Sequence, residues 1–209
     1  MIISSGKSAV VATVVLCATA VLLSALVVPP KAQTTPVSAQ EIVLVVDPGQ
    51  SKVHFSVDST LHTVHGTFAL KSGNVHFDPE SGKAGGEIVV YATSGESGNG
   101  SRDAKMHKDV LQSQKYPDVV FRPVQVDGKV ARAGVSDVKL HGVIALHGQE
   151  HEIVVPVHAE LLADHWTGSA AFGVPYIEWG MKDPSNWLLK VKPVVHVELQ
   201  MAGSTRLPN

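Results

Sequence analysis

The stretch from Val135 to Leu161, VSDVKLHGVIALHGQEHEIVVPVHAEL, decides the fold class. Apolar and polar side chains alternate along it, on both sides of Gly148-Gln149. Alternation with a period of two is the signature of half-buried strands, and a Gly-containing pair between two such runs can form a hairpin turn. The apolar set of the second run is Ile153, Val155, Val157, Ala159 and Leu161. The stretch therefore predicts a long antiparallel hairpin with one apolar face.

The same alternation continues over most of the chain between Val53 and Met201. The other expected strands are Lys52–Asp58, Val64–Leu70, Asn74–Asp78, Glu87–Ala92, Val119–Val126, Trp166–Phe172 and Lys190–Met201. A series of half-buried antiparallel strands must close or stack to hide its apolar face. We therefore predict an all-β protein, an antiparallel barrel of about eight strands, a size that can hold one small ligand.

Only the segment from Ser101 to Tyr116 breaks this pattern. Met106, Val110 and Leu111 fall at helical spacing and form one apolar stripe. Ser101 is the expected N-cap, and the helix should end before Pro117, because the residue ahead of a proline avoids the α region. One short helix is thus expected, with the structural role of closing or buttressing one end of the barrel.

The N-terminal part of the chain has a different character. Residues 9–28 form an almost continuous apolar run, which is long enough to cross a bilayer, since about 20 residues suffice, and is also compatible with a secretory signal peptide. We assign residues 1–28 to a signal peptide or membrane anchor, 29–44 to a Pro-containing linker, 45–203 to the barrel and 204–209 to a tail. The location expected is periplasmic or extracytoplasmic, with anchoring to the inner membrane if the segment is not cleaved.

Charge and cysteine content limit the function classes further. Two of the 17 basic residues, Lys7 and Lys31, precede Glu41, whereas all 19 acidic residues lie from Glu41 onward, which leaves that part with a net charge of −4. Nucleic-acid binding requires a basic footprint and is disfavoured. The single cysteine, Cys17, lies in the apolar run, so the exported part has no disulfides.

Several local motifs, taken in order, resemble the YceI-like family. They are residues 47–57, 64–68, 73–79, 102–111, 116–121 and 141–157, which together span nearly the whole exported domain. The resemblance implies an exported, lipocalin-like barrel whose apolar channel binds a polyisoprenoid chain, without catalytic residues. Three segments depart from the family pattern: the His- and Glu-containing hairpin at 146–152, residues 105–109, and residues 172–187. These departures concern contacts to a ligand head group more than the fold.

A lipid tail needs apolar walls, and burial contributes about 25 cal/mol per Å² of apolar surface. Aromatic side chains supply the most wall area per residue. The wall candidates are Phe55, Phe68, Phe77, Val90, Phe121, Ile144, Val155, Trp166 and Phe172. Each of them could also be an ordinary core residue. The expected guest is an amphiphilic or polyisoprenoid lipid, quinone-like lipids included, and no other cofactor is expected.

Other functions remain open at this point. The chain has 11 histidines, and His141, His147 and His151 bracket one hairpin, but a zinc site needs three or four converging ligands and the spacing matches no zinc motif. No nucleophile elbow, phosphate loop or HExxH motif is present, so we do not expect an enzyme. A barrel with a filled core could instead bind a protein through the loop at residues 94–100, and a homodimer could form through a barrel edge or the helix.

Overall fold

The computed structural model describes residues 41–206. The expected signal peptide or anchor at residues 1–28, residues 29–40 of the linker, and residues 207–209 of the tail therefore lie outside the described residues. Within the described range, no helix is long and apolar enough to cross a membrane.

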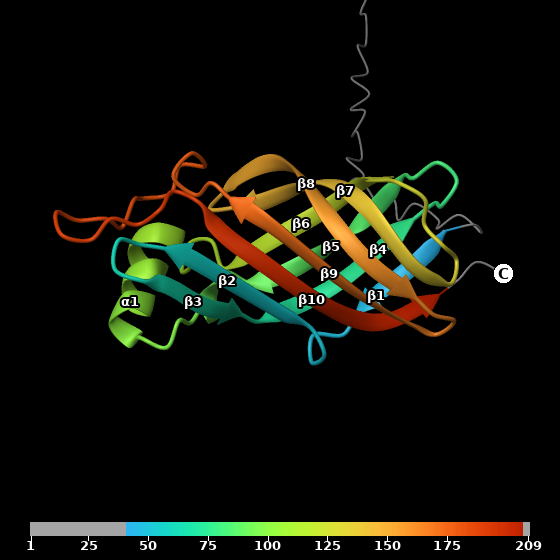
Figure 1. The fold of residues 1–209 in the computed structure, drawn as a ribbon, viewed down its shortest axis with the longest axis horizontal. Coiled ribbons are helices and arrows are strands. Elements are labelled where there is room, and N and C mark those ends of the chain that lie inside the picture. Colours follow the sequence, from blue (N-terminus) through green and yellow to red (C-terminus); the bar gives the residue numbers. More distant parts are fainter. Residues whose placement is uncertain (1–40, 207–209) are drawn as a thin grey trace, which may run out of the picture. The chain divides into compact units, whose positions relative to one another are not determined.

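The described chain forms a closed antiparallel sheet (Figure 1), as the alternation predicted. Its strands are β1 (Ile42–Val46), β2 (Lys52–Asp58), β3 (Thr63–Phe68), β4 (Leu70–Phe77), β5 (Ala84–Tyr91), β6 (Asp118–Asp127), β7 (Gly134–Leu146), β8 (Gln149–Leu161), β9 (His165–Val174) and β10 (Val195–Arg206). They follow the order β1-β4-β5-β6-β7-β8-β9-β10, and β1 pairs with β10 to close the ring. The predicted all-β barrel of about eight strands is confirmed.

Ten strands fill eight positions because two positions are each shared by two short strands. The second half of β10 pairs with β1, Gly203 lying opposite Val46, and its first half pairs with β2, Gln200 lying opposite Lys52. The turn after β1 is held by the Asp47 carboxylate, which accepts hydrogen bonds from the Gly49 amide (2.8 Å) and the Gln50 side chain (2.6 Å). The next position is divided in the same way between β3 and β4, which meet at Ala69.

The sequence did not predict β1, whose first residues lie in the range assigned to the linker. IVLVV has no alternation, because three of its five side chains are buried and one is only half exposed. The last strand also differs: it begins at Val195 rather than Lys190 and continues to Arg206. Residues 190–192 instead run along the β2–β3 turn, where the Lys190 carbonyl accepts a hydrogen bond from the Thr60 amide (2.9 Å).

The predicted helix is present between β5 and β6. A 3₁₀ turn, η1 (Ala92–Ser94), precedes α1 (Gly100–Lys105), which continues as one turn of π-helix, η2 (Met106–Leu111). The N-cap is Asn99 rather than Ser101, since the Asn99 side chain accepts a hydrogen bond from the Arg102 amide. The helix ends at Gln112, which adopts the left-handed conformation (φ 47°). Figure 1 shows α1 across one end of the barrel.

The inward side chains form two packed clusters, one toward each end of the barrel. The cluster away from α1 contains the most deeply buried residues, Ile42 (0% exposed) and Leu161 (1%), together with Trp166 (7%). The cluster near α1 is built around Ile144, Val174 and Met181. The described residues 41–206 belong to one compact unit with a closed sheet and its own core, so this domain should fold by itself.

Barrel closure gives a direct test of the fold. A methyl group at Gly203 would collide with the carbonyl oxygen of Val45, where β10 crosses β1. Because the obstacle is backbone, we expect Gly203→Ala to lower the free energy of unfolding by about 1–3 kcal/mol, as for other overpacked sites. Urea unfolding followed by circular dichroism measures this change.

Gly100 is the matched control, since a methyl group there would meet nothing within 4 Å. Alanine is the better helix former by up to about 1 kcal/mol, so Gly100→Ala should leave the stability unchanged or raise it. Equal unfolding midpoints for Gly203→Ala and the parent domain would show that the β1–β10 contact is not tight.

Candidate functional site

The barrel interior is hollow. Its cavity has a volume of about 620 Å³ and is lined by inward side chains from the strands, the helix and the β9–β10 loop. This volume falls within the range of small-molecule sites, about 300–1,000 Å³. Almost all the lining side chains are apolar, so the interior favours an apolar guest over water.

All nine wall candidates from the sequence line this cavity. The set consists of Phe55 on β2, Phe68 on β3, Phe77 on β4, Val90 on β5, Phe121 on β6, Ile144 on β7, Val155 on β8, and Trp166 and Phe172 on β9. The rings of Phe55 and Phe68 pack against each other with centroids 5.2 Å apart. That these residues contact a ligand stays a prediction.

The small inward residues divide into two groups. Gly66 and Gly142 are covered by rings, because a methyl group would collide with Phe55 at the first and Phe121 at the second; glycine at such places allows close packing inside a strand. Ala159 and Ala170, in contrast, line the cavity. The first group therefore serves wall packing, and the second leaves volume in the interior.

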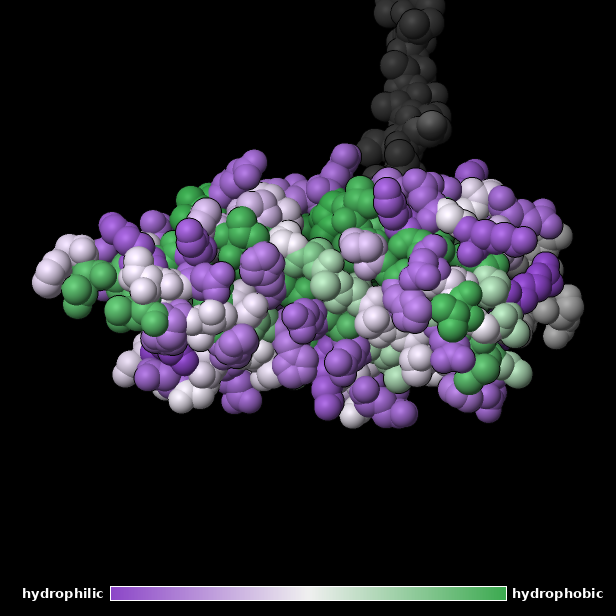
Figure 2. Space-filling view, in the orientation of Figure 1, coloured by the Kyte–Doolittle hydropathy of each residue, from purple (hydrophilic) through white to green (hydrophobic). Residues whose placement is uncertain are grey.

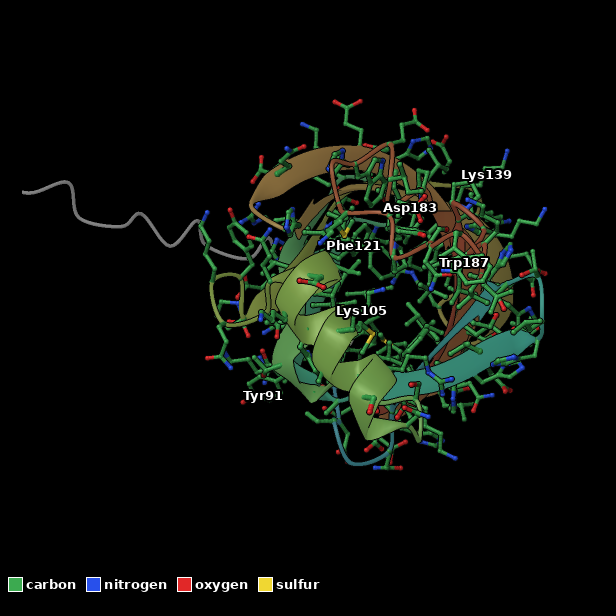
Figure 3. All side chains as sticks on the ribbon, turned by 90° about the vertical axis from the view of Figure 1, so that its left-hand side faces the viewer. Tyr91, Lys105, Phe121, Lys139, Asp183 and Trp187 are labelled. Atoms are coloured by element: carbon green, nitrogen blue, oxygen red, sulfur yellow. The ribbon has the colours of Figure 1, made fainter. Side chains whose placement is uncertain are left out.

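One end of the cavity is polar. Five polar residues line the cavity at this end, and they come from the β2–β3 turn, α1 and the segment before α1: Ser59, His62, Ser97, Arg102 and Lys105. Figure 3 looks at this end: α1 crosses part of it, and Lys105 lies between the helix and the loop that carries Asp183 and Trp187. We call this end the mouth. Lys105 donates a hydrogen bond to the carbonyl oxygen of Pro184 (3.0 Å), which joins the helix to that loop.

The helix does more than close the barrel. The predicted stripe of Met106, Val110 and Leu111 faces inward and lines the cavity. Sequence reasoning assigned this stripe a structural role, because helical spacing alone does not distinguish a packed face from a cavity wall. The helix therefore covers part of the mouth and also forms part of the cavity wall.

A polar network fixes α1 in this place. The Asp103 carboxylate accepts hydrogen bonds from the amide (3.0 Å) and the hydroxyl of Ser97, and the Arg102 guanidinium donates to the Ser97 hydroxyl and carbonyl, both at 2.7 Å. Partial burial raises the pKa of Asp103, but the Ser97 hydrogen bonds and the Arg102 charge outweigh it, so the pKa lies below its usual range. The network is thus ionised at neutral pH.

A second contact fixes η2. One ring nitrogen of His107 lies 2.8 Å from the Gly95 carbonyl oxygen, and the other lies 3.0 Å from the hydroxyl of Ser113, which is buried. Because a carbonyl can only accept, the ring nitrogen that faces Gly95 is the donor in that contact. His107 therefore connects the helix to both of its flanking loops.

The loop between β9 and β10 supplies wall residues that sequence reasoning missed. Tyr176, Met181, Leu189 and Val191 line the cavity, although residues 175–194 have no regular alternation. The only available signal was the concentration of large apolar residues in an irregular segment. Burial, with a smaller contribution from the charge of Asp183, raises the pKa of Tyr176 to about 12, so the phenol is neutral at this part of the wall.

The histidines of the long hairpin lie outside the cavity. His151 stacks on Trp179, with ring centroids 4.2 Å apart, and His147 packs against Tyr116 at 4.9 Å. Burial, with the nearby charge of Lys115, lowers the pKa of His147. Within residues 41–206, no group of three or more His, Cys, Asp or Glu side chains is placed to hold a metal ion.

The family comparison matches the YceI-like domain over residues 44–202. This chain belongs to the YceI-like family. The match covers most of the chain; it includes β2 to β9 in full and parts of β1 and β10. The resemblance found in the sequence is therefore confirmed. No match was found among curated proteins.

Solved structures share the fold at low sequence identity. BcnA from Burkholderia cenocepacia is 16% identical, with a TM-score of 0.61, and the alignment covers 76% of this chain and 99% of BcnA. A polyisoprenoid-binding domain from Saccharophagus degradans, implicated in plant cell wall breakdown, is 13% identical, with a TM-score of 0.61 and coverage of 81% and 99%. At these identities the similarity establishes the barrel fold alone.

The Ser97–Asp103–Arg102 network predicts a pH-dependent mouth. Asp103→Asn removes the charge and should raise amide hydrogen exchange of residues 100–111 several-fold, because a charged acceptor forms stronger hydrogen bonds than a neutral one. In the parent domain the ionised carboxylate contributes fully above its unfolded pKa of about 4, and the contribution is lost as the pH falls through the lowered folded pKa. Exchange measured by mass spectrometry tests both effects.

Asp109→Asn provides the control. Asp109, which is half-buried, forms a long ion pair of 3.9 Å with the exposed Lys182, and ion pairs that are open to solvent contribute little to stability. Its exchange pattern should match that of the parent. If Asp103→Asn and Asp109→Asn behave alike, the network does not hold α1 in place.

Proposed function

We propose that this protein binds the apolar chain of an amphiphilic lipid, such as a polyisoprenoid or a quinone-like lipid, in the barrel cavity without catalysing a reaction. The observation that carries the proposal is the cavity itself, which is about 620 Å³ in volume and lined almost throughout by apolar side chains. Such a surface gains about 25 cal/mol for each Å² removed from water. A long apolar chain can thus be bound without a specific polar contact.

The polar mouth supports an amphiphile rather than a plain hydrocarbon. Arg102 and Lys105 lie at this end of the cavity, next to Ser59, His62 and Ser97. A lipid whose tail occupies the interior would leave its head group among these side chains. The description of the S. degradans relative as a polyisoprenoid-binding domain supports an isoprenoid tail for this chain as well.

The arrangement of the mouth does not favour catalysis. Of the two serines that line the mouth, Ser59 donates its hydroxyl to the backbone carbonyl of His62 (2.7 Å), and Ser97 donates its hydroxyl to the Asp103 carboxylate. A nucleophilic serine instead needs its hydroxyl on the base itself. Transport, storage or stress protection is therefore the role that we propose.

The proposed place of action is the cell envelope. The apolar run at residues 9–28 would direct the domain across the inner membrane or hold it there. Fractionation of cells that produce the full chain tests this proposal, with recovery expected in the periplasmic or membrane fraction. Recovery in the cytoplasm would contradict it.

Native mass spectrometry of residues 36–209, expressed with export to the periplasm, is the direct test of lipid binding. We expect a stoichiometric adduct that organic extraction removes and identifies as a lipid. An apo mass that does not change after incubation with isoprenoid quinones would contradict the proposal.

Two neighbouring alanines of β9 provide a matched pair of variants. Ala170 lines the cavity, whereas Ala171, the next residue, faces outward and is exposed. Ala170→Phe should reduce the adduct strongly by filling the interior, and Ala171→Phe should leave it unchanged. Near-ultraviolet circular dichroism checks that both variants stay folded. Equal loading of the two folded variants would place the ligand outside the cavity.

A further inference from the structure

The end of the barrel that carries the mouth also carries the most exposed apolar side chains of the described residues. They are Trp187 (90% exposed), Leu61 (69%) and Leu188 (65%). Figure 2 shows green, hydrophobic side chains at the left-hand tip, where Figure 1 places the β9–β10 loop beyond the end of the barrel. Single exposed apolar residues are ordinary, but a concentration of them at a ligand entrance marks an interaction site.

The loop is built to hold Trp187 and Leu188 outward. The Asn186 side chain accepts hydrogen bonds from the amides of Leu188 (2.9 Å) and Leu189 (2.8 Å), and the Asn186 amide donates to the Leu189 carbonyl (2.9 Å). These bonds form a tight turn with Trp187 and Leu188 at its tip. Their exposure is therefore set by backbone geometry.

The base of the loop is fixed to the rest of the mouth. The Val191 amide donates to the Ser185 hydroxyl (2.9 Å), and the Lys190 carbonyl accepts from Thr60 in the turn that carries Leu61 (2.9 Å). The three exposed side chains thus belong to two segments that are bonded to each other. We call Leu61, Trp187 and Leu188 the mouth tip.

Charges around the mouth tip complement an anionic surface. Residues 182–192 contain Lys182, Lys190 and Lys192 against Asp183, and Lys182 also pairs with Asp109 of η2 at 3.9 Å. The loop together with this partner therefore carries a net charge of +1, within a domain whose net charge is negative. Trp at a membrane interface, with apolar neighbours and flanking lysines, is the composition typical of membrane-surface binding. Lysines near anionic head groups add attraction that salt weakens.

The mouth tip is continuous with the cavity. Leu189 and Val191 of the same loop, and Ser59 and His62 of the neighbouring turn, line it. A flat surface that contacts Trp187, Leu188 and Leu61 would therefore lie directly against the entrance.

We propose that the mouth tip docks on the surface of an anionic phospholipid bilayer, so that a lipid chain passes between the bilayer and the cavity without crossing water. This proposal rests on the proposed function for its purpose, but docking itself requires no bound lipid. The proposed partner of this surface is the bilayer. Binding to a second copy of the chain or to another protein would be a different outcome of the test.

The test uses residues 36–209, so that the N-terminal apolar run cannot contribute. Vesicles of phosphatidylcholine with about one quarter phosphatidylglycerol provide the anionic surface, and pure phosphatidylcholine vesicles the neutral one. Trp187 is the reporter, since Trp166 is buried and Trp179 half-buried. We expect co-sedimentation with the anionic vesicles and a blue shift of the tryptophan emission, both weaker at high salt and on neutral vesicles.

Trp187→Ser/Leu188→Ser should reduce the partitioning by about tenfold or more, because it removes two large apolar side chains from the contact. The control is Val124→Thr/Val135→Thr, which changes two exposed apolar residues (52% and 54%) on the outer face of β6 and β7. It should bind vesicles like the parent. Equal partitioning of the two double variants, or no vesicle binding by the parent, would overturn the proposal.

Further readouts separate docking from lipid binding. Trp187→Ser/Leu188→Ser should load lipid from detergent micelles to the same extent as the parent but take it from vesicles more slowly. If neither protein yields a lipid adduct, the proposed function fails, and the vesicle assay still decides on docking. Dimers that dissociate in this variant, without vesicle binding by the parent, would assign the mouth tip to self-association and overturn membrane docking.

Discussion

The pairing of β10 with both β1 and β2 is the constraint on which the rest of the structure depends. Without it, the sheet would have two open edges and an apolar face exposed to water. β10 makes closure possible because it is long enough to pair with β2 along its first half and with β1 along its second. Once the ring is closed, backbone hydrogen bonds connect β1 and the strands β4 to β10 into a continuous wall, with β2 and β3 extending it toward the mouth. The interior can then stay partly empty, and the cavity is a consequence of closure.

The two ends of the barrel differ in how they are closed. At the far end, Ile42, Leu161 and Trp166 pack into a nearly water-free cluster, whereas at the mouth a short helix takes the place of a continuous wall. That helix is held by polar groups, Asp103 with Ser97 and His107 with Gly95. Polar contacts at a surface can open at lower free energy than a packed core. The asymmetry therefore makes the mouth the end at which the cavity can open more easily.

Period-two alternation allowed most of the wall to be predicted, because the parity of a strand residue decides its side of the sheet. Phe55, Ile144 and Val155 were placed inside by this rule alone, and they line the cavity. Where the rule has no information, prediction failed. β1 is buried on both faces at several positions and shows no alternation, and the loop that contains Tyr176 and Met181 has no period at all. Whether inward residues enclose a void depends on distances across the barrel, which no local pattern encodes.

The lipid that we propose for the apolar cavity is insoluble in water, and such a guest cannot reach the barrel by free diffusion at a useful concentration. The entrance must therefore meet the guest where it resides. The arrangement of the mouth is consistent with this requirement: Trp187 and Leu188 project from the same loop whose Leu189 and Val191 line the interior. Apolar surface is thus continuous from the tip of the loop to the cavity wall, and the charged groups of Lys105 and Lys190 lie beside that path. In the proposed function, the β9–β10 loop, which the sequence alone left without a structure, would both contribute to the lipid-binding wall and carry the side chains that acquire the lipid.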